Sequence, residues 1–454
     1  MSQQRSSGRD GAGRRAVRDW CEALVAVVAG LGVMIGTAAL GLWAAGAADL
    51  PEGTFPQLVA AIVVMAAGGP VELSGEAGLI AETDAGLTVL PLSVTLAGAL
   101  TIAACFLRPL RHRAAVGARE PALRILPLAA LWVAALSGLA ALARHSFAIP
   151  LGDETAVDIG ELLDITPRAG FRADIPLTAL LGLLWPAGLL VLALLVSREA
   201  ALPARPARSQ ESARPAAFAM VVLLLAYVVL GLVIGLVVAA TRPHPAETFA
   251  VLLLGLPNLV WLGFTLGLGV SWEGRVTGPF GLPMPRMLDA VLRAPDDSTR
   301  DTLNTLNLAT LSDHDGRAWW LPVVAAVLLV AAAVLLVAAA FLMAARSPAR
   351  TRPWQHAVHM AVALTLTVLT VCLVARISAH YGLSPLGIGD LGGGLAGDVL
   401  LRPRVWTALG LAAGWGLITG LLGSVLWTAS RAGWRLRGGR SISQEELHAD
   451  SHHR

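Results

Sequence analysis

The chain has 454 residues, of which 56% are hydrophobic and only 14% are charged. A soluble globular protein of this size needs more charge on its surface, so the composition excludes that class. Glycine shows no triplet period and there are only three cysteines, which excludes collagen-like and disulfide-stapled proteins. All 34 residues counted as Lys or Arg are arginine, and the net charge of +3 is too small to indicate nucleic-acid binding. The composition predicts a protein of the lipid bilayer.

Hydropathy predicts an all-α, polytopic transmembrane bundle, because a spanning helix needs about 20 predominantly apolar residues. The eight expected spans cover residues 23–46, 87–107, 125–143, 175–196, 216–240, 319–344, 357–377 and 405–427. The first span is longer than the ~7–15 apolar residues of a secretory signal, so we expect it to be retained.

Two further apolar stretches are ambiguous. Residues 55–69 are too few to cross comfortably, and residues 248–270 are interrupted by Pro257 and Asn258. We expect both to be re-entrant segments packed among the spans, since irregular backbone at membrane depth must be surrounded by protein. A helix lying on the membrane surface, or a plain loop, is the alternative.

The arginines favour eight spans over ten, because flanking basic residues stay in the cytoplasm. With eight spans, the cytoplasmic segments hold 22 arginines and 9 acidic residues, whereas the outer segments hold 12 and 22. Ten spans would place the clusters at Arg108 and Arg198 outside. The pattern predicts a plasma-membrane protein with both termini in the cytoplasm. In its outer loops, residues 155–163 and a segment that begins at Pro285 predict short helices.

The chain divides into a basic tail (1–22), a first membrane half (23–205), a second membrane half (206–428) and a polar tail (429–454). Both halves have the same order of helices, loops and ambiguous stretches. The strings GVMIG (Gly32–Gly36) and GLVIG (Gly231–Gly235) occupy matching places, as do PEGTF and PAETF. This order indicates a parallel two-fold repeat of four helices about an axis along the membrane normal. Coincidence between short apolar strings is the alternative.

Glycines spaced by four residues place two small surfaces on one helix face, which lets helix backbones approach closely in lipid. We expect such helix packing at Gly32, Gly36, Gly231, Gly235, Gly410, Gly414, Gly416 and Gly420.

The sequence offers little chemistry. No acidic residue falls well inside an expected span, no lysine exists to complete a phosphate loop, and there is no HExxH, GxSxG or CxxC motif. We therefore expect no catalytic, cofactor or metal site. The expected partners are the lipid bilayer and an unidentified protein, with no nucleic acid.

One group of polar residues could line an outer vestibule if both ambiguous stretches re-enter the membrane. It recurs at matching places in the two halves and comprises Glu72, Ser74, Glu76, Pro257, Asn258, Trp272 and Glu273.

Several strings resemble one protein family. They are VELSGEAGLIAETDAGLTVLPLSVTLAGAL, FLRPLRHR (Phe106–Arg113) and LPNLVWLGFTLGLGVSWEGRVTGPFGLPMPRMLDAVLR (Leu256–Arg293). They resemble the streptophobe family, very hydrophobic polytopic proteins of streptomycetes and related actinobacteria. The resemblance implies an actinobacterial plasma membrane and transfers no functional residue.

Together these features predict an uncharacterised, non-enzymatic component of the membrane. The alternative is a permease that moves a small or amphipathic molecule between the two four-helix halves.

Overall fold

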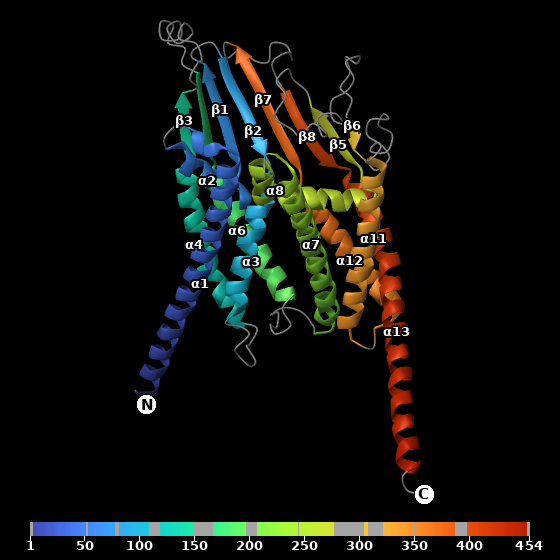
Figure 1. Cartoon of the computed structure of the whole chain (residues 1–454). Coiled ribbons are helices and arrows are strands. Elements are labelled where there is room, and N and C mark those ends of the chain that lie inside the picture. The colour runs from blue at the N-terminus through green and yellow to red at the C-terminus, as the bar shows by residue number, and fades with distance from the viewer. Residues whose placement is uncertain are drawn as a thin grey trace, which may run out of the picture.

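The computed structural model describes residues 3–50, 53–77, 81–108, 119–148, 167–196, 207–243, 245–276, 304–306, 321–348, 351–385 and 397–451. These residues form two layers, a bundle of helices and a β-sheet that stands on one end of it, with strands that rise away from the helices (Figure 1). Both chain termini lie at the opposite end of the bundle (Figure 1). We call the two ends the sheet end and the terminus end.

The first half begins with α1 (Gln3–Ala44), the 3-10 helix η1 (Ala47–Asp49) and α2 (Thr54–Ala66). It continues with β1 (Val71–Ala77), β2 (Ala81–Thr88), α3 (Leu92–Leu107), α4 (Arg119–Leu142), β3 (Arg144–Ala148), β4 (Pro167–Ala173) and α6 (Ile175–Val196).

The second half repeats this order. It begins with α7 (Ala207–Thr241), α8 (Pro245–Gly267), β5 (Trp272–Val276) and β6 (Asn304–Leu306). It ends with α11 (Leu321–Arg346), α12 (Pro353–Val374), β7 (Ile377–Pro385), β8 (Gly397–Pro403) and α13 (Val405–Ser451).

The expected polytopic helical bundle is present. Eight helices of the described part have the length and hydropathy of membrane spans. Their surfaces expose large apolar side chains such as Val229, Ile234 and Leu184, each more than half exposed, as helices facing lipid require.

The course of the chain separates the spanning helices from the re-entrant ones. α1 runs from the N-terminus to the sheet end, and α3, which follows the β1–β2 hairpin, returns to the terminus end (Figure 1). α8 is long and apolar enough to span, but it follows α7 and precedes β5, so both of its ends lie at the sheet end. α2 likewise lies between η1 and β1. The chain therefore crosses the bundle through α1, α3, α4, α6, α7, α11, α12 and α13.

Three details of the expected segments differ. The seventh span ends at Val374 rather than residue 377, because Ile377 pairs with Leu401 in the sheet. The second span begins at Leu92 rather than residue 87, because Leu87 and Thr88 pair in the sheet and Pro91 precedes the first helical turn. α8 continues as one helix through Pro257, where proline and asparagine indicated a break, although one hydrogen bond of its ladder is replaced by contacts with Ser93.

The sheet was not predicted from the sequence, which assigned these segments to loops. It has eight strands in the order β3-β4-β1-β2-β7-β8-β5-β6, and all neighbouring pairs are antiparallel. Strands such as VELSGEA and AETDAGLT are rich in glycine and acidic residues, which disfavour strands when considered alone. Pairing with neighbours on both sides supplies the stability that the local sequence lacks. The short helices expected at 155–163 and after Pro285 lie outside the described residues.

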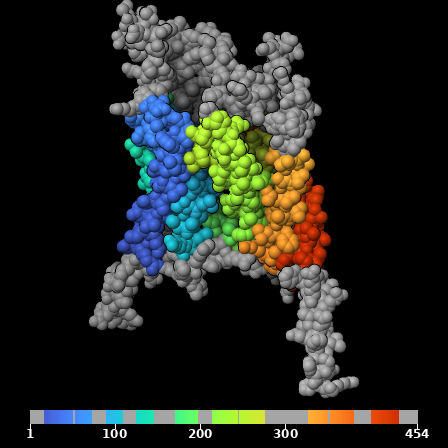
Figure 2. Space-filling model, viewed as in Figure 1, coloured from blue at the N-terminus to red at the C-terminus, as the bar shows by residue number. Residues whose placement is uncertain are grey.

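The strand order corrects the expected symmetry. A two-fold axis along the membrane normal would reverse the order of the second four strands relative to the first. Instead, each half arranges its four strands in the same order along the sheet, with the third strand first, then the fourth, the first and the second. The second half therefore repeats the first half after a shift along the sheet. The helices of the first half (blue to green) stand beside those of the second (yellow-green to red) in Figure 2. The duplication is tandem.

The turns after the re-entrant helices show the same duplication at atomic detail. Gly68 and Gly269 have φ values of 89° and 88°, which favour glycine because it lacks a Cβ. Their N–H groups donate to the carbonyl oxygens of Met65 (2.9 Å) and Leu266 (2.8 Å). Each turn redirects the chain from a re-entrant helix into a strand.

Candidate functional site

The residues expected to line an outer vestibule are dispersed in the structure. Trp272 is fully buried, and its Nε1–H donates to Oγ1 of Thr265 at 3.0 Å. Glu273 accepts a hydrogen bond from Nε of Arg404 at 2.7 Å, whereas Glu72 is exposed. The side chains of Ser74 and Glu76 lie outside the described set, although their backbones pair with β2. Pro257 and Asn258 belong to α8, within the bundle.

Asn258 joins the two halves at the N-terminus of α3. Its Oδ1 accepts a hydrogen bond from the N–H of Leu92 at 3.2 Å, and its Nδ2 donates to the carbonyl oxygen of Leu90 at 2.9 Å. A helix N-terminus inside a membrane protein leaves N–H groups that water cannot satisfy. Asn258 therefore serves as a cap supplied by the other half of the chain.

A second polar contact lies beside it. The hydroxyl of Ser93 donates to the carbonyl oxygen of Leu252 (2.9 Å) and accepts from the N–H of Leu256 (3.0 Å). These two groups would bond to each other in a regular helix, so Ser93 of α3 is inserted into the hydrogen-bond ladder of α8. Together with Asn258, it fixes α8 against α3.

The glycines expected in helix packing fall into two groups. A Cβ on Gly420 would lie 2.7 Å from Cα of Ala357, and one on Gly416 would overlap Cα of Ala361, so α13 contacts the backbone of α12 at both positions. Gly231 and Gly235 of α7 lie against Val260 and Leu252 of α8. Among the described residues, nothing lies within 4 Å of the Cβ positions of Gly32, Gly36, Gly410 and Gly414, so the close packing expected there is not found between described segments. The matching glycines diverge because α8 reaches α7 where the shorter α2 leaves α1 open.

A hollow lies between the two halves, bordered by α6 of the first half and by α7 and α12 of the second. We call it the inter-half groove; its volume is about 520 Å³, within the ~300–1,000 Å³ of typical ligand sites. The lining residues are Leu192 and Leu195 of α6; Ala213, Ala216, Ala217, Met220, Val221 and Leu224 of α7; and His359, Val362, Ala363, Leu366, Thr367 and Thr370 of α12.

The inter-half groove is apolar even at its two threonine residues. The hydroxyls of Thr367 and Thr370 donate to carbonyl oxygens of their own helix, those of Ala363 (2.8 Å) and Leu366 (2.9 Å). They need no partner in the groove. His359 is the one ionisable side chain among the lining residues.

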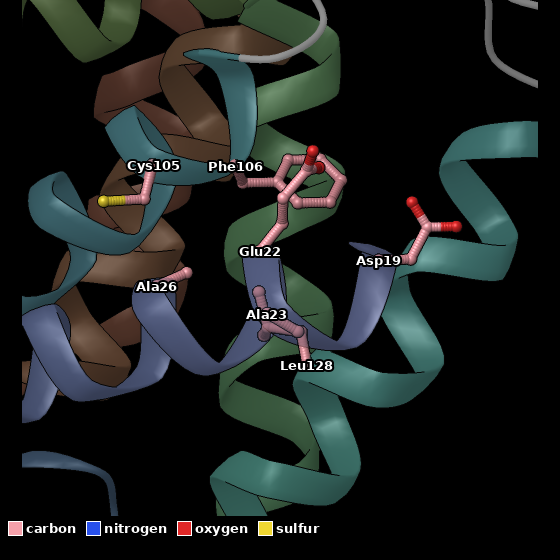
Figure 3. A pocket seen from close by; sticks show the side chains of 7 residues that line it. All are labelled: Asp19, Glu22, Ala23, Ala26, Cys105, Phe106 and Leu128. Carbon is pink, nitrogen blue, oxygen red and sulfur yellow. The ribbon is translucent and has the colours of Figure 1, made fainter. Parts of the chain in front are cut away.

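A smaller cavity lies near the terminus end of α1, between α1, α3 and α4 (Figure 3). Its volume of about 20 Å³ holds one water molecule. Two acidic side chains of α1, Asp19 and Glu22, line it beside Phe106 and Leu128. Glu22 also forms an ion pair with Arg18 at 3.2 Å. The cavity is too small for an organic ligand.

Among the described residues, no group of three or more His, Cys, Asp or Glu side chains is placed to hold a metal ion. The three cysteines are free.

Sequence reasoning singled out Asn258 as a residue of an outer vestibule, and it missed both the hydrogen bonds of Asn258 to Leu90 and Leu92 and the inter-half groove. Ser93 could have been singled out as a polar residue in an apolar helix directly after a proline. The groove has no comparable signal, because alanines such as Ala217 and Ala363 are common throughout the chain.

Comparisons of the chain with protein-family models, with curated proteins and with solved structures find no match in any of the three.

Proposed function

We propose that the chain is a non-enzymatic component of the plasma membrane, with both termini in the cytoplasm, that holds an eight-stranded sheet at the outer side of the bilayer. The observation that carries this proposal is the continuity of the sheet across both halves. β2 of the first half pairs with β7 of the second from Ala81↔Pro385 to Thr88↔Ser378. A single sheet of this kind suits a binding platform for another protein of the cell surface. The resemblance to the streptophobe family supports the same location.

The packing of the bundle supports an anchoring role. α13 contacts the backbones of α12 and α11 through Gly416, Gly420 and Gly423, which leaves no room for a passage there. We call the contact region between the two halves the seam. At the sheet end it is closed by α8, which packs on both α1 and α3. Such a bundle holds the sheet in a fixed orientation.

Orientation is tested by cysteine labelling in a background where Cys21, Cys105 and Cys372 are replaced by alanine. Glu72→Cys, at the sheet end, should react with a membrane-impermeant maleimide in intact cells. Arg352→Cys, at the terminus end, should react only after permeabilisation. Labelling of Arg352→Cys in intact cells would overturn the orientation.

The binding platform is tested by placing a photo-crosslinking amino acid at Glu72 in β1 and Arg172 in β4, which are paired in the sheet and exposed. We expect discrete protein adducts from these positions in living cells. The matched control is Val330 of α11, an apolar side chain that is 60% exposed on the bundle and should contact lipid only. Equal adduct patterns at all three positions would contradict a platform role for the sheet.

The inter-half groove favours a second function, a permease for an amphipathic molecule. A permease must open the seam past α8, so joining α3 to α8 covalently should abolish transport. Proteoliposomes distinguish the two functions: the anchor moves no fluorescent lipid between leaflets, whereas a permease does so and stops when α3 and α8 are crosslinked.

A further inference from the structure

We infer that the inter-half groove is a binding site for one acyl chain of an anionic phospholipid from the leaflet at the terminus end. This inference concerns the bundle and does not depend on the platform role of the sheet.

The length of the groove matches one leaflet. Its lining extends from Ala213 to Leu224 on α7 and from His359 to Thr370 on α12, about 16 Å in each case at the helical rise. The hydrocarbon core of a bilayer is ~30 Å thick, so the groove covers about half of it. Leu192 and Leu195 lie near the last residue of α6, which places the groove in the half of the bundle next to the termini.

The groove ends at mid-depth because α8 crosses above it. Leu224, the lining residue of α7 nearest the sheet, accepts a hydrogen bond through its carbonyl oxygen from Nε1 of Trp261 at 3.3 Å. Trp261 belongs to α8, which is fixed to α3 through Asn258 and Ser93. A chain that enters from the terminus end can therefore extend to the bilayer centre and no further.

The walls select a hydrocarbon chain. Small residues on two facing helices, Ala216, Ala217 and Ala363, create the hollow, and leucine, valine and methionine side chains border it. The threonine hydroxyls already bond to their own helix, so a polar ligand would gain no partners there while losing its hydration. An acyl chain has no such cost, and the surrounding bilayer supplies it at high concentration.

The mouth of the groove selects a negatively charged headgroup. His359 lines this end, and Arg214 follows Ala213 at the same level of α7. The terminus end as a whole carries 22 arginines against 9 acidic residues in the expected topology. A phosphodiester at this level is attracted to the arginines and can accept a hydrogen bond from the His359 ring, whereas a zwitterionic headgroup is attracted less.

The test uses the full chain in vesicles of phosphatidylcholine and phosphatidylglycerol, each in turn carrying a diazirine at the acyl-chain end. After illumination and digestion, adducts should concentrate in the groove-lining peptides of α6, α7 and α12. The double variant Ala217→Phe and Ala363→Phe fills the groove and should lower these adducts at least fivefold. The control Ala326→Phe places the same side chain on an exposed position of α11 and should leave them unchanged.

Two results would overturn the inference. One is an even spread of adducts over all lipid-facing helices that the double variant does not alter. The other is protein–protein adducts from the groove, which would show that a helix of a second copy occupies it. For the headgroup, phosphatidylglycerol should label the groove several-fold more than phosphatidylcholine, and His359→Leu should reduce this preference. An equal preference in His359→Leu and the wild type would refute the role of the histidine.

Discussion

The two halves share an element order but differ in how their re-entrant helices are used. α2 has 13 residues and packs within its own half, whereas α8 has 23 residues and extends across the seam to α1 and α3 of the other half. In a tandem arrangement, corresponding sides of the two halves have different surroundings, because one faces the other half and its counterpart faces outward. Only one of the two re-entrant helices can therefore reach the neighbouring half. The comparison teaches that the second half, through α8, carries most of the contacts that unite the chain.

The helix pair that ends each half also differs. In the first half, α4 and α6 meet through the stacked rings of Trp132 and Trp185, with centroids 4.8 Å apart. In the second half, α12 and α13 meet backbone to backbone at Gly416 and Gly420. Both pairs exclude lipid, but the glycine contact tolerates no added atom, while the tryptophan contact is made by side chains that can adjust.

The largest expected effect comes from Gly416→Leu. Overpacking usually costs ~1–3 kcal/mol, and the cost here should be higher because the obstacle is the backbone of Ala361. The variant should lose its thermal unfolding transition in detergent. Gly414→Leu, on the same helix with nothing within 4 Å, should leave Tm unchanged or raise it slightly. If both variants behave alike, the α12–α13 contact is not as close as described.

The seam between the halves should be the next most sensitive. Asn258→Leu leaves the N–H of Leu92 and the carbonyl of Leu90 without their partner, at a cost of about 2 kcal/mol for the two groups. Tm in detergent should fall, and limited proteolysis should become faster between the halves. Thr101→Val is the control, since its hydroxyl bonds only to Ala97 within α3. An equal loss in Thr101→Val would remove the argument for a special role of the seam.

A smaller effect is expected under the sheet. Thr265→Val deprives the buried Nε1–H of Trp272 of its acceptor and should cost about 1 kcal/mol. The matching positions of the first half, Val64 and Val71, are both apolar and buried. In the double variant Thr265→Val and Trp272→Phe, the indole N–H is absent as well as its acceptor. No unpaired donor remains, so the cost of the lost hydrogen bond should not increase further. A double-mutant cycle in Tm measures this coupling, and strict additivity would contradict it.

The smallest effect concerns the ion pair between Glu273 and Arg404, whose side chains are 30% and 50% exposed. Glu273→Gln should cost less than about 1 kcal/mol, and the difference from the wild type should shrink in high salt. Glu72, which occupies the matching position in the first half, is exposed, so Glu72→Gln should leave the stability unchanged. The residue that precedes α6 in the first half, as Arg404 precedes α13 in the second, is Asp174. It accepts a hydrogen bond from the N–H of Leu177 at 3.0 Å and caps α6.

Much of the bundle could be predicted from the sequence because lipid imposes a simple rule on each segment separately. A run of about 20 apolar residues must form a helix that satisfies its own backbone, and this rule located 175–196 with both ends correct. Asn258 was identifiable for the same reason, as a polar group inside such a run. Ser93 and the inter-half groove were not, because their roles depend on which helices become neighbours.

Composition and hydropathy determined that this chain belongs in a bilayer, and together with the arginine distribution they predicted eight crossings and one order of elements repeated in the two halves. Only the tertiary structure decided that the outer segments form one sheet, that the repeat advances along this sheet instead of turning about an axis, and that α8 joins the halves. The physical reason is the range of the forces involved. Hydrophobic transfer acts on each helix by itself, whereas strand pairing, capping by Asn258 and glycine contacts require a partner that is distant in the sequence.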